Sequence, residues 1–310
     1  MSHNFLYFYQ HLPEAVSPIA FSVGPLSIQW YPLMYLIGFV IVYFLLRYRI
    51  KKGEAEKIFN FQFFRLRQIS QSETISKQFS IFKFQNNLLI DLLLWIFAGL
   101  VVGARLGYVL FYNLPYYWQY PLSIISPFDP VTHQYIGIYG MSYHGGLIGV
   151  FIAGWLFARK YKINFWHLGN FIAPAVPAGY FFGRIGNFMN GELWGRATTA
   201  WWGMYFPDSG GTENFIQLRY PSQFIEAFLE GIILFLILWP LRNKKFVREN
   251  ALAVYLLGYA LTRFLAEFFR APDSQLGFIF GPFTMGQVLS VILVAAVILI
   301  FCIQKTKKVV

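Results

Sequence analysis

Residues 183–196 have the sequence Gly-Arg-Ile-Gly-Asn-Phe-Met-Asn-Gly-Glu-Leu-Trp-Gly-Arg and directly follow the apolar stretch 163–182. Because about twenty apolar residues span a bilayer, this run is expected to begin where a helix leaves the lipid. It nevertheless contains Arg184, Asn187 and Glu192, and polar groups at that depth are costly and usually functional. Its glycines weaken a helix and allow the backbone to open toward a ligand. We therefore expect a functional site here.

The composition predicts an all-α membrane protein. The chain has 310 residues, of which 57% are hydrophobic and 13% charged, and its mean hydropathy is +0.49. A soluble domain would be more charged. We expect one integral membrane domain over residues 1–310, built as a bundle of about seven transmembrane helices. The single cysteine, Cys302, excludes a disulfide framework and a cysteine metal cluster.

Seven apolar segments are candidates for membrane-spanning helices. They are 28–46, 88–110, 143–158, 163–182, 222–240, 251–269 and 283–304. An odd number of spans places the termini on opposite sides. Nineteen of the 25 basic residues lie in stretches that follow alternate segments, namely 47–87, 159–162, 242–248 and 305–308. By the positive-inside rule these stretches and the C-terminus are cytoplasmic, and the N-terminus faces outward.

Three loops follow from this topology. Residues 51–87 form a cytoplasmic loop that could hold an amphipathic surface helix. Residues 111–141 and 193–220 form periplasmic loops rich in aromatic residues. Such side chains usually anchor a protein at the headgroup level, although the two loops together could also cover a site on the outer face. No internal repeat is visible, which weakens an inverted-repeat transporter hypothesis.

The six basic residues outside those cytoplasmic stretches are all arginines: Arg105, Arg184, Arg196, Arg219, Arg263 and Arg270. Lysine and arginine are equally able to set the orientation of a membrane protein. Only arginine has a planar set of donors that binds phosphate bidentately. This asymmetry indicates a phosphate-bearing ligand. The net charge of +11 is otherwise explained by topology and anionic membrane lipid, so no nucleic-acid partner is expected.

One predicted helix carries a polar stripe. Tyr259, Arg263, Glu267 and Arg270 follow one another at four, four and three residues, which at about 100° per residue keeps them on one helix face. An Arg–Glu pair that only locks helices together is the alternative, but the additional arginine favours a ligand. Candidate partners for the arginines are Asp91, Glu226 and Glu230, and the sequence does not pair them.

His144 and Tyr31 are further candidates on the outer side. Ser142 is a plausible N-cap of the helix that contains His144. The helix N-terminus would disfavour a protonated imidazole, so His144 could accept a proton; a structural histidine is equally compatible. Tyr31 alone would be a membrane-interface aromatic. Arg105 lies among small residues at 103–107, a close-packing arrangement that could support the site.

Several catalytic motifs are absent. The sequence contains no Gly-x-Ser-x-Gly, no P-loop and no His-Glu-x-x-His. An enzyme with this sequence would therefore rely on neither its own serine nucleophile nor a metal, and the nucleophile would come from a substrate.

The motifs together resemble those of the bacterial prolipoprotein diacylglyceryl transferases. They occur in the expected order through nearly the whole chain: Gln-Trp-Tyr at 29–31, Gly-Ala-Arg-Leu-Gly-Tyr at 103–108, His-Gly-Gly-Leu-Ile-Gly at 144–149, the run at 183–195, the stripe from Tyr259 to Arg270, and Thr-Met-Gly-Gln at 284–287. The 51–87 loop is longer than expected for the family.

The resemblance implies an inner-membrane enzyme that works without a cofactor. It would transfer diacylglycerol from phosphatidylglycerol to the lipobox cysteine thiol at a prolipoprotein signal peptide, forming a thioether and releasing glycerol 1-phosphate. It implies that Arg184 and Arg263 bind phosphatidylglycerol. The other positions that the family also uses are Tyr31, His144, Asn187, Glu192, Gly195, Tyr259 and Glu267. A different lipid headgroup or acyl transferase, or a phospholipid or anion transporter, would use similar intramembrane charges.

Overall fold

The computed structural model describes residues 2–24, 26–55, 74–134, 140–207, 217–272 and 277–306. Its internal contacts group the chain into two compact units. The first comprises Met1–Leu46 with Gly169–Val310, and the second comprises Arg47–Leu168. The expectation of a single domain stays a prediction.

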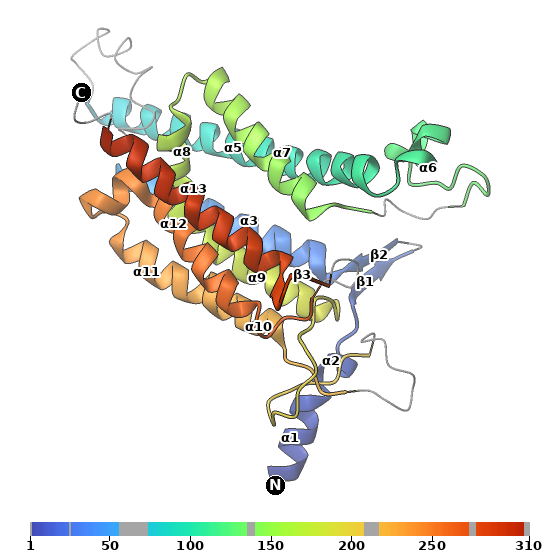
Figure 1. Cartoon of the computed structure of the whole chain (residues 1–310). Helices are drawn as coiled ribbons and strands as arrows, with labels where there is room; N and C mark the ends of the chain where they lie inside the picture. The colour runs from blue at the N-terminus through green and yellow to red at the C-terminus, as the bar shows by residue number, and fades with distance from the viewer. Residues whose placement is uncertain are drawn as a thin grey trace. The chain divides into compact units, whose positions relative to one another are not determined.

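The first unit contains most of the helices (Figure 1). Its elements are α1 (Ser2–Gln10), α2 (Leu12–Ala15), β1 (Ile19–Val23), β2 (Leu26–Gln29), α3 (Trp30–Lys51, which runs into the second unit), α8 (Phe165–Ile172, which begins in the second unit), η3 (Ala173–Ala175), α9 (Val176–Met189), α10 (Ser222–Glu226), η4 (Ala227–Ile233), α11 (Leu234–Leu241), α12 (Lys245–Ala266), β3 (Phe278–Phe280), β4 (Phe283–Thr284) and α13 (Met285–Thr306). Helix α12 packs against both α11 and α13, and α9 packs against η4. The two short antiparallel hairpins, β1–β2 and β3–β4, were not expected from the sequence.

The expected apolar segment 163–182 is interrupted. Helix α8 gives way to the 3-10 turn η3, and α9 then continues to Met189. Pro174 and Pro177 explain the break, because proline lacks the backbone N–H that an uninterrupted helix requires. The expectation that the glycines at 183 and 186 open the backbone is wrong, since both lie inside α9. Among the four glycines of this run at positions 183, 186, 191 and 195, Gly191, just beyond the helix, has a positive φ of 68°.

The second unit is built on α5 (Thr74–Phe111) and α7 (Tyr143–Lys160), joined by α6 (Leu114–Gln119) and η2 (Pro121–Ile124). Glycines allow α5 and α7 to pack backbone against backbone. A Cβ on Gly145 would overlap the carbonyl oxygen of Gly103 and lie 2.8 Å from the Cα of Gly107. The close packing expected around Arg105 is thus confirmed. Part of the expected 51–87 loop is helical, because α5 already begins at Thr74; residues 56–73 lie outside the described residues.

Four of the described helices are long and apolar enough to cross a membrane: Trp30–Lys51, Asn86–Phe111, Ser222–Leu241 and Met285–Cys302. Large apolar side chains on these helices are exposed, for example Leu236 and Val291, as expected for contact with lipid. The other three predicted spans coincide with α7, with α8–η3–α9 and with α12. The mainly helical membrane fold is confirmed, whereas the number of seven spans stays a prediction.

Candidate functional site

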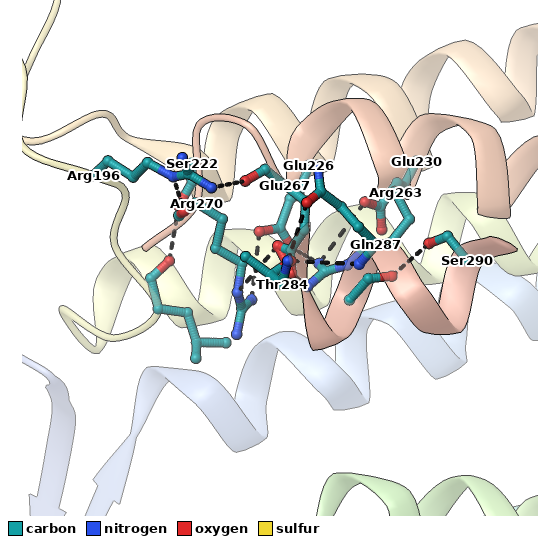
Figure 2. Close-up of polar contacts among 12 residues, drawn as sticks. Arg196, Ser222, Glu226, Glu230, Arg263, Glu267, Arg270, Thr284, Gln287 and Ser290 are labelled. Carbon is teal, nitrogen blue, oxygen red and sulfur yellow. Dashed lines mark hydrogen bonds and ion pairs between the residues drawn. The ribbon is translucent and has the colours of Figure 1, made fainter. Parts of the chain in front are cut away.

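Three arginines converge on the buried carboxylate of Glu226, at the end of α10. Its Oε2 lies 2.9 Å from Arg184 Nε and 2.8 Å from Arg263 Nη1, and its Oε1 lies 3.5 Å from Arg270 Nη1. Glu226 has no exposed surface. Figure 2 shows Glu226, Arg263 and Arg270 in this cluster. A buried carboxylate must be paired to remain ionised, and here arginines from α9, from α12 and from the turn after α12 pair with it.

A second carboxylate comes from the polar stripe of α12. Arg263 Nη2 donates to Oε1 of Glu267 at 3.0 Å, and Arg270 Nε lies 3.9 Å from the other oxygen, Oε2. The contacts confirm that the stripe lies on one face. The Arg–Glu pair weighed from the sequence does exist, but Arg263 also binds Glu226 on another helix. Glu230, one turn after Glu226, is buried with its Oε1 3.9 Å from Arg263 Nη1.

Arg184 extends the cluster toward Glu192. Its Nε lies 2.7 Å from the Tyr180 hydroxyl, and its Nη1 donates to Asn187 Oδ1 at 3.0 Å. Asn187 Nδ2 in turn donates to Glu192 Oε1 at 3.0 Å. Tyr259 is connected to these hydrogen-bonded residues through Tyr180, because the ring centroids of Tyr180 and Tyr259 lie 5.9 Å apart. Arg184 and Asn187, one helical turn apart on α9, therefore connect the Glu226 cluster to the loop beyond the helix.

That loop is held in an unusual backbone conformation. Leu193 has a φ of 60°, which is unfavourable for a residue with a side chain. Two side chains of α10 bind its backbone: Ser222 Oγ donates to the Leu193 carbonyl at 2.9 Å, and Gln223 Nε2 donates to the Glu192 carbonyl at 2.7 Å. Ser222 and Gln223 were not predicted as site residues, because no local sequence pattern connects them to a loop about thirty residues earlier.

Glu192 and Gly195 occupy different environments in this loop. Burial raises the pKa of the Glu192 carboxyl above its ordinary value, and the Asn187 hydrogen bond and the Arg184 charge partly oppose that shift. Gly195 is packed between two backbone segments, because a Cβ there would overlap the Tyr220 carbonyl oxygen and lie 2.5 Å from that of Phe269. No larger residue fits at position 195 without moving the backbone.

Tyr31 lies beside the same helix. Its hydroxyl donates to the Tyr35 hydroxyl at 3.0 Å, and a Cβ on Gly186 of α9 would lie 3.3 Å from the Tyr31 Cα. Among the residues expected at the site, the first unit thus contains Tyr31, Arg184, Asn187, Glu192, Gly195, Tyr259, Arg263 and Glu267. His144 belongs to the second unit, where it is exposed at the start of α7. Ser142 caps that helix, accepting from the Gly145 N–H at 3.2 Å, as expected.

The remaining arginines bind backbone carbonyl groups. Arg105 donates to the carbonyl oxygens of Ser123, Ile124 and Gly140. Arg196 donates to those of Glu267 and Arg270, and Arg219 donates to that of Gly195. The bias toward arginine outside the cytoplasmic stretches therefore has a structural cause as well, since one guanidinium can bind several carbonyls at once. Asp91, considered as an arginine partner, accepts from the Tyr161 hydroxyl at 3.0 Å.

The comparison with protein families gives a match over residues 18–303 to the model described as "Prolipoprotein diacylglyceryl transferase". This chain belongs to that family. It is 43% identical over 295 residues to the phosphatidylglycerol–prolipoprotein diacylglyceryl transferase of Chlorobaculum tepidum, covering 94% of this chain and 91% of the relative. The enzyme of the same name from Francisella tularensis subsp. novicida is 42% identical over 296 residues, covering 94% and 96%. That from Legionella pneumophila strain Paris is 42% identical over 277 residues, covering 89% and 92%.

The family assignment confirms the resemblance inferred from the motifs. The names of these relatives include phosphatidylglycerol, which is an anionic phospholipid. In the part of the chain that the structure describes, no group of three or more histidine, cysteine or acidic side chains is arranged to hold a metal ion.

Proposed function

We propose that this chain transfers the diacylglyceryl group of phosphatidylglycerol to a prolipoprotein. Family membership supports the activity. The single structural observation that carries the proposal is the convergence of Arg184 and Arg263 on one oxygen of the buried Glu226. Two guanidinium groups brought together among membrane-spanning helices can bind the phosphate of a lipid.

The acceptor in this proposal is the thiol of the lipobox cysteine at the prolipoprotein signal peptide. Its sulfur attacks the glyceryl C3 carbon, so that a carbon–sulfur bond forms and the bond from that carbon to the phosphate oxygen breaks. The products are a thioether and glycerol 1-phosphate, and the thiol proton leaves with a base. No atom of Cys302 takes part.

Arg184 and Arg263 are placed to stabilise the charge that grows on the leaving phosphate. A donor directed at developing charge stabilises the transition state more than the ground state. Among the described residues, Arg184 uses Nε and Nη1 for its hydrogen bonds and ion pair, which leaves Nη2 for a lipid phosphate. Glu226 holds both guanidinium groups before the substrate arrives, and this arrangement limits the reorganisation needed during reaction.

The other predicted site residues would supply the base and position the reacting groups. A cysteine thiol with a pKa near ~8.5 is mostly protonated at neutral pH, so a base assists the reaction, and His144 is our candidate. Its place at a helix N-terminus could instead bind a phosphate oxygen. Tyr31, Asn187, Glu192, Tyr259 and Glu267 would position or contact the reacting groups, and Gly195 would line the lipid site. We propose the bacterial inner membrane as the location, with this chemistry on the periplasmic side.

Substituting Arg184 by lysine tests the role of the guanidinium. Lysine keeps the positive charge, but its donors lie on a single nitrogen that cannot occupy the separate positions of Nε and Nη1, which bind Glu226 and Asn187. The rate constant kcat should therefore fall roughly 10²-fold or more. The measurement is single-turnover transfer from phosphatidylglycerol to a lipobox peptide in detergent, with folding checked by thermal melting. Arg242→Lys is the matched control, because Arg242 binds the carbonyl and ring of Trp239 outside the cluster.

An Arg184→Lys enzyme that works at the wild-type rate would show that the phosphate binds elsewhere. The same assay separates the proposed reaction from its rivals. A transporter releases no glycerol phosphate, and another headgroup or acyl transferase shows no glycerol phosphate release that depends on a lipobox peptide. Peptide-dependent release is the result expected here.

A further inference from the structure

Gly286, the second residue of α13, faces the carboxylate of Glu267. A Cβ at this position would overlap Glu267 Oε1 and lie 2.7 Å from Cδ and 3.1 Å from Cγ. The three nearest atoms all belong to the Glu267 side chain, and none belongs to the backbone. The missing side chain at position 286 therefore provides the space in which this carboxylate lies.

The first turn of α13 is held firmly in place. Thr284 and Gln287 form a reciprocal cap: the Thr284 N–H donates to Gln287 Oε1 at 3.1 Å, and the Gln287 N–H donates to Thr284 Oγ1 at 3.4 Å. Ser290 Oγ also donates to the Gly286 carbonyl at 2.7 Å. Thr284, Gln287 and Ser290 are buried (Figure 2). A side chain added at position 286 would consequently displace the flexible end of Glu267 rather than the helix.

The position of Glu267 determines that of Arg263. The oxygen that a Cβ on Gly286 would overlap is Oε1, the atom that accepts from Arg263 Nη2 at 3.0 Å. The carboxylate of Glu267 faces the N-terminal end of the 22-residue helix α13, where the helix dipole favours a negative charge. Glu267 and Glu226 hold Arg263 from two sides, through Nη2 and Nη1.

We propose that Gly286 is a positioning residue for the transfer reaction: by lacking a side chain it seats Glu267 on the first turn of α13, and Glu267 orients Arg263. This inference rests on the proposed function. It gives a physical role to the Thr-Met-Gly-Gln motif at 284–287. The cap residues hold the turn, and the glycine leaves room for the carboxylate.

The test is the rate of diacylglyceryl transfer by Gly286→Ala. Alanine favours a helix more than glycine does, which offsets part of the stability lost with the displaced carboxylate, so the variant should still fold, as thermal melting can show. The displaced Glu267 should lower kcat by about tenfold or more, as expected for a lost hydrogen bond between charged groups, with a smaller change in KM. Gly169→Ala is the matched control, since its Cβ would press on the flexible end of Leu252 and on no charged group. It should keep the wild-type rate.

The same substitution is also made in a Glu267→Asp variant, to test whether its effect acts through the Glu267 carboxylate. Glu267→Asp shortens the side chain by one methylene and withdraws the carboxylate from Gly286, so adding Gly286→Ala to Glu267→Asp should cost less than about threefold. An equal loss in both backgrounds, or a wild-type rate for Gly286→Ala, would overturn the inference alone. Absence of transfer by the wild-type chain would overturn the proposed function and the inference with it.

Discussion

Glu192 illustrates how much of the site depends on single hydrogen bonds. It is partly buried in the loop after α9 and accepts from Asn187, which in turn accepts from Arg184. A carboxylate removed from water must be stabilised by its neighbours. Here one amide and one more distant guanidinium supply that stabilisation, and burial still raises the pKa of the carboxyl.

Glu192→Gln should change how stability depends on pH. Because the pKa of Glu192 is raised on folding, the folded state binds its proton more tightly than the unfolded state does. This contribution to stability is present below the ordinary pKa of about 4.3 and is lost as pH rises through the folded-state pKa. Glutamine cannot ionise, yet its Oε1 can still accept from Asn187.

The melting temperature of the wild type should therefore fall relative to that of Glu192→Gln as pH is raised from about 4 to about 8. Both proteins are measured in the same detergent, so that other titrating groups cancel in the difference. A difference that stays constant with pH, or that changes in favour of the wild type, would contradict this assignment.

Helices α5 and α7 approach one another through glycines. Gly103 and Gly107 on α5 face Gly145 on α7, at distances that leave no room for a Cβ. Helices in lipid gain little from apolar contact alone, so close backbone packing supplies much of their association. Arg105 adds a polar connection by binding the carbonyls of the loop between the two helices.

Gly145→Ala should destabilise this helix pair. The added methyl group overlaps the backbone of α5, which cannot rotate away as a side chain can, and overpacking of this kind costs about 1–3 kcal/mol. Gly154→Ala on the same helix is the control, because its Cβ would lie 3.7 Å from the Phe165 ring, an ordinary contact distance. Thermal melting in detergent should show a lower midpoint for Gly145→Ala only. Equal midpoints would mean that the helices are not this close.

For the whole molecule, the distribution of lysine and arginine predicts the orientation in the membrane. The chain contains one cysteine, Cys302, which is exposed on α13. Because the attacking thiol in the proposed reaction belongs to the prolipoprotein, Cys302→Ser should keep full transfer activity. A large loss in a normally folded variant would instead indicate a thiol intermediate on the enzyme.

The cysteine-free variant also allows the orientation to be measured. A membrane-impermeant maleimide added to intact cells should label Val131→Cys, in the exposed part of the predicted periplasmic loop, and should not label Ser76→Cys, near the start of α5. Both cysteines should react after the membrane is permeabilised. Labelling of Ser76→Cys in intact cells would reverse the predicted topology.

The sequence alone determined the features that depend on local periodicity. Apolar length located the helices, the spacing of Arg263, Glu267 and Arg270 placed them on one face, and Ser142 marked a helix start. The ordered motifs also indicated the family. The signals for helices, for the shared face and for the helix start each lie within a few turns of helix, where the chain geometry is the same in every protein.

Only the tertiary structure decided which charges meet. Glu226 and Arg263 are 37 residues apart, and Glu226 and Arg184 are on different helices; charge alone made Asp91 and Glu230 equally good partners. The packing of α9, α10 and α12 selected Glu226. Tertiary packing also assigned Arg105, Arg196 and Arg219 to backbone carbonyls. The physical reason is that an ion pair in a low-dielectric interior depends on distances of a few ångströms between helices, which no periodicity within one helix encodes.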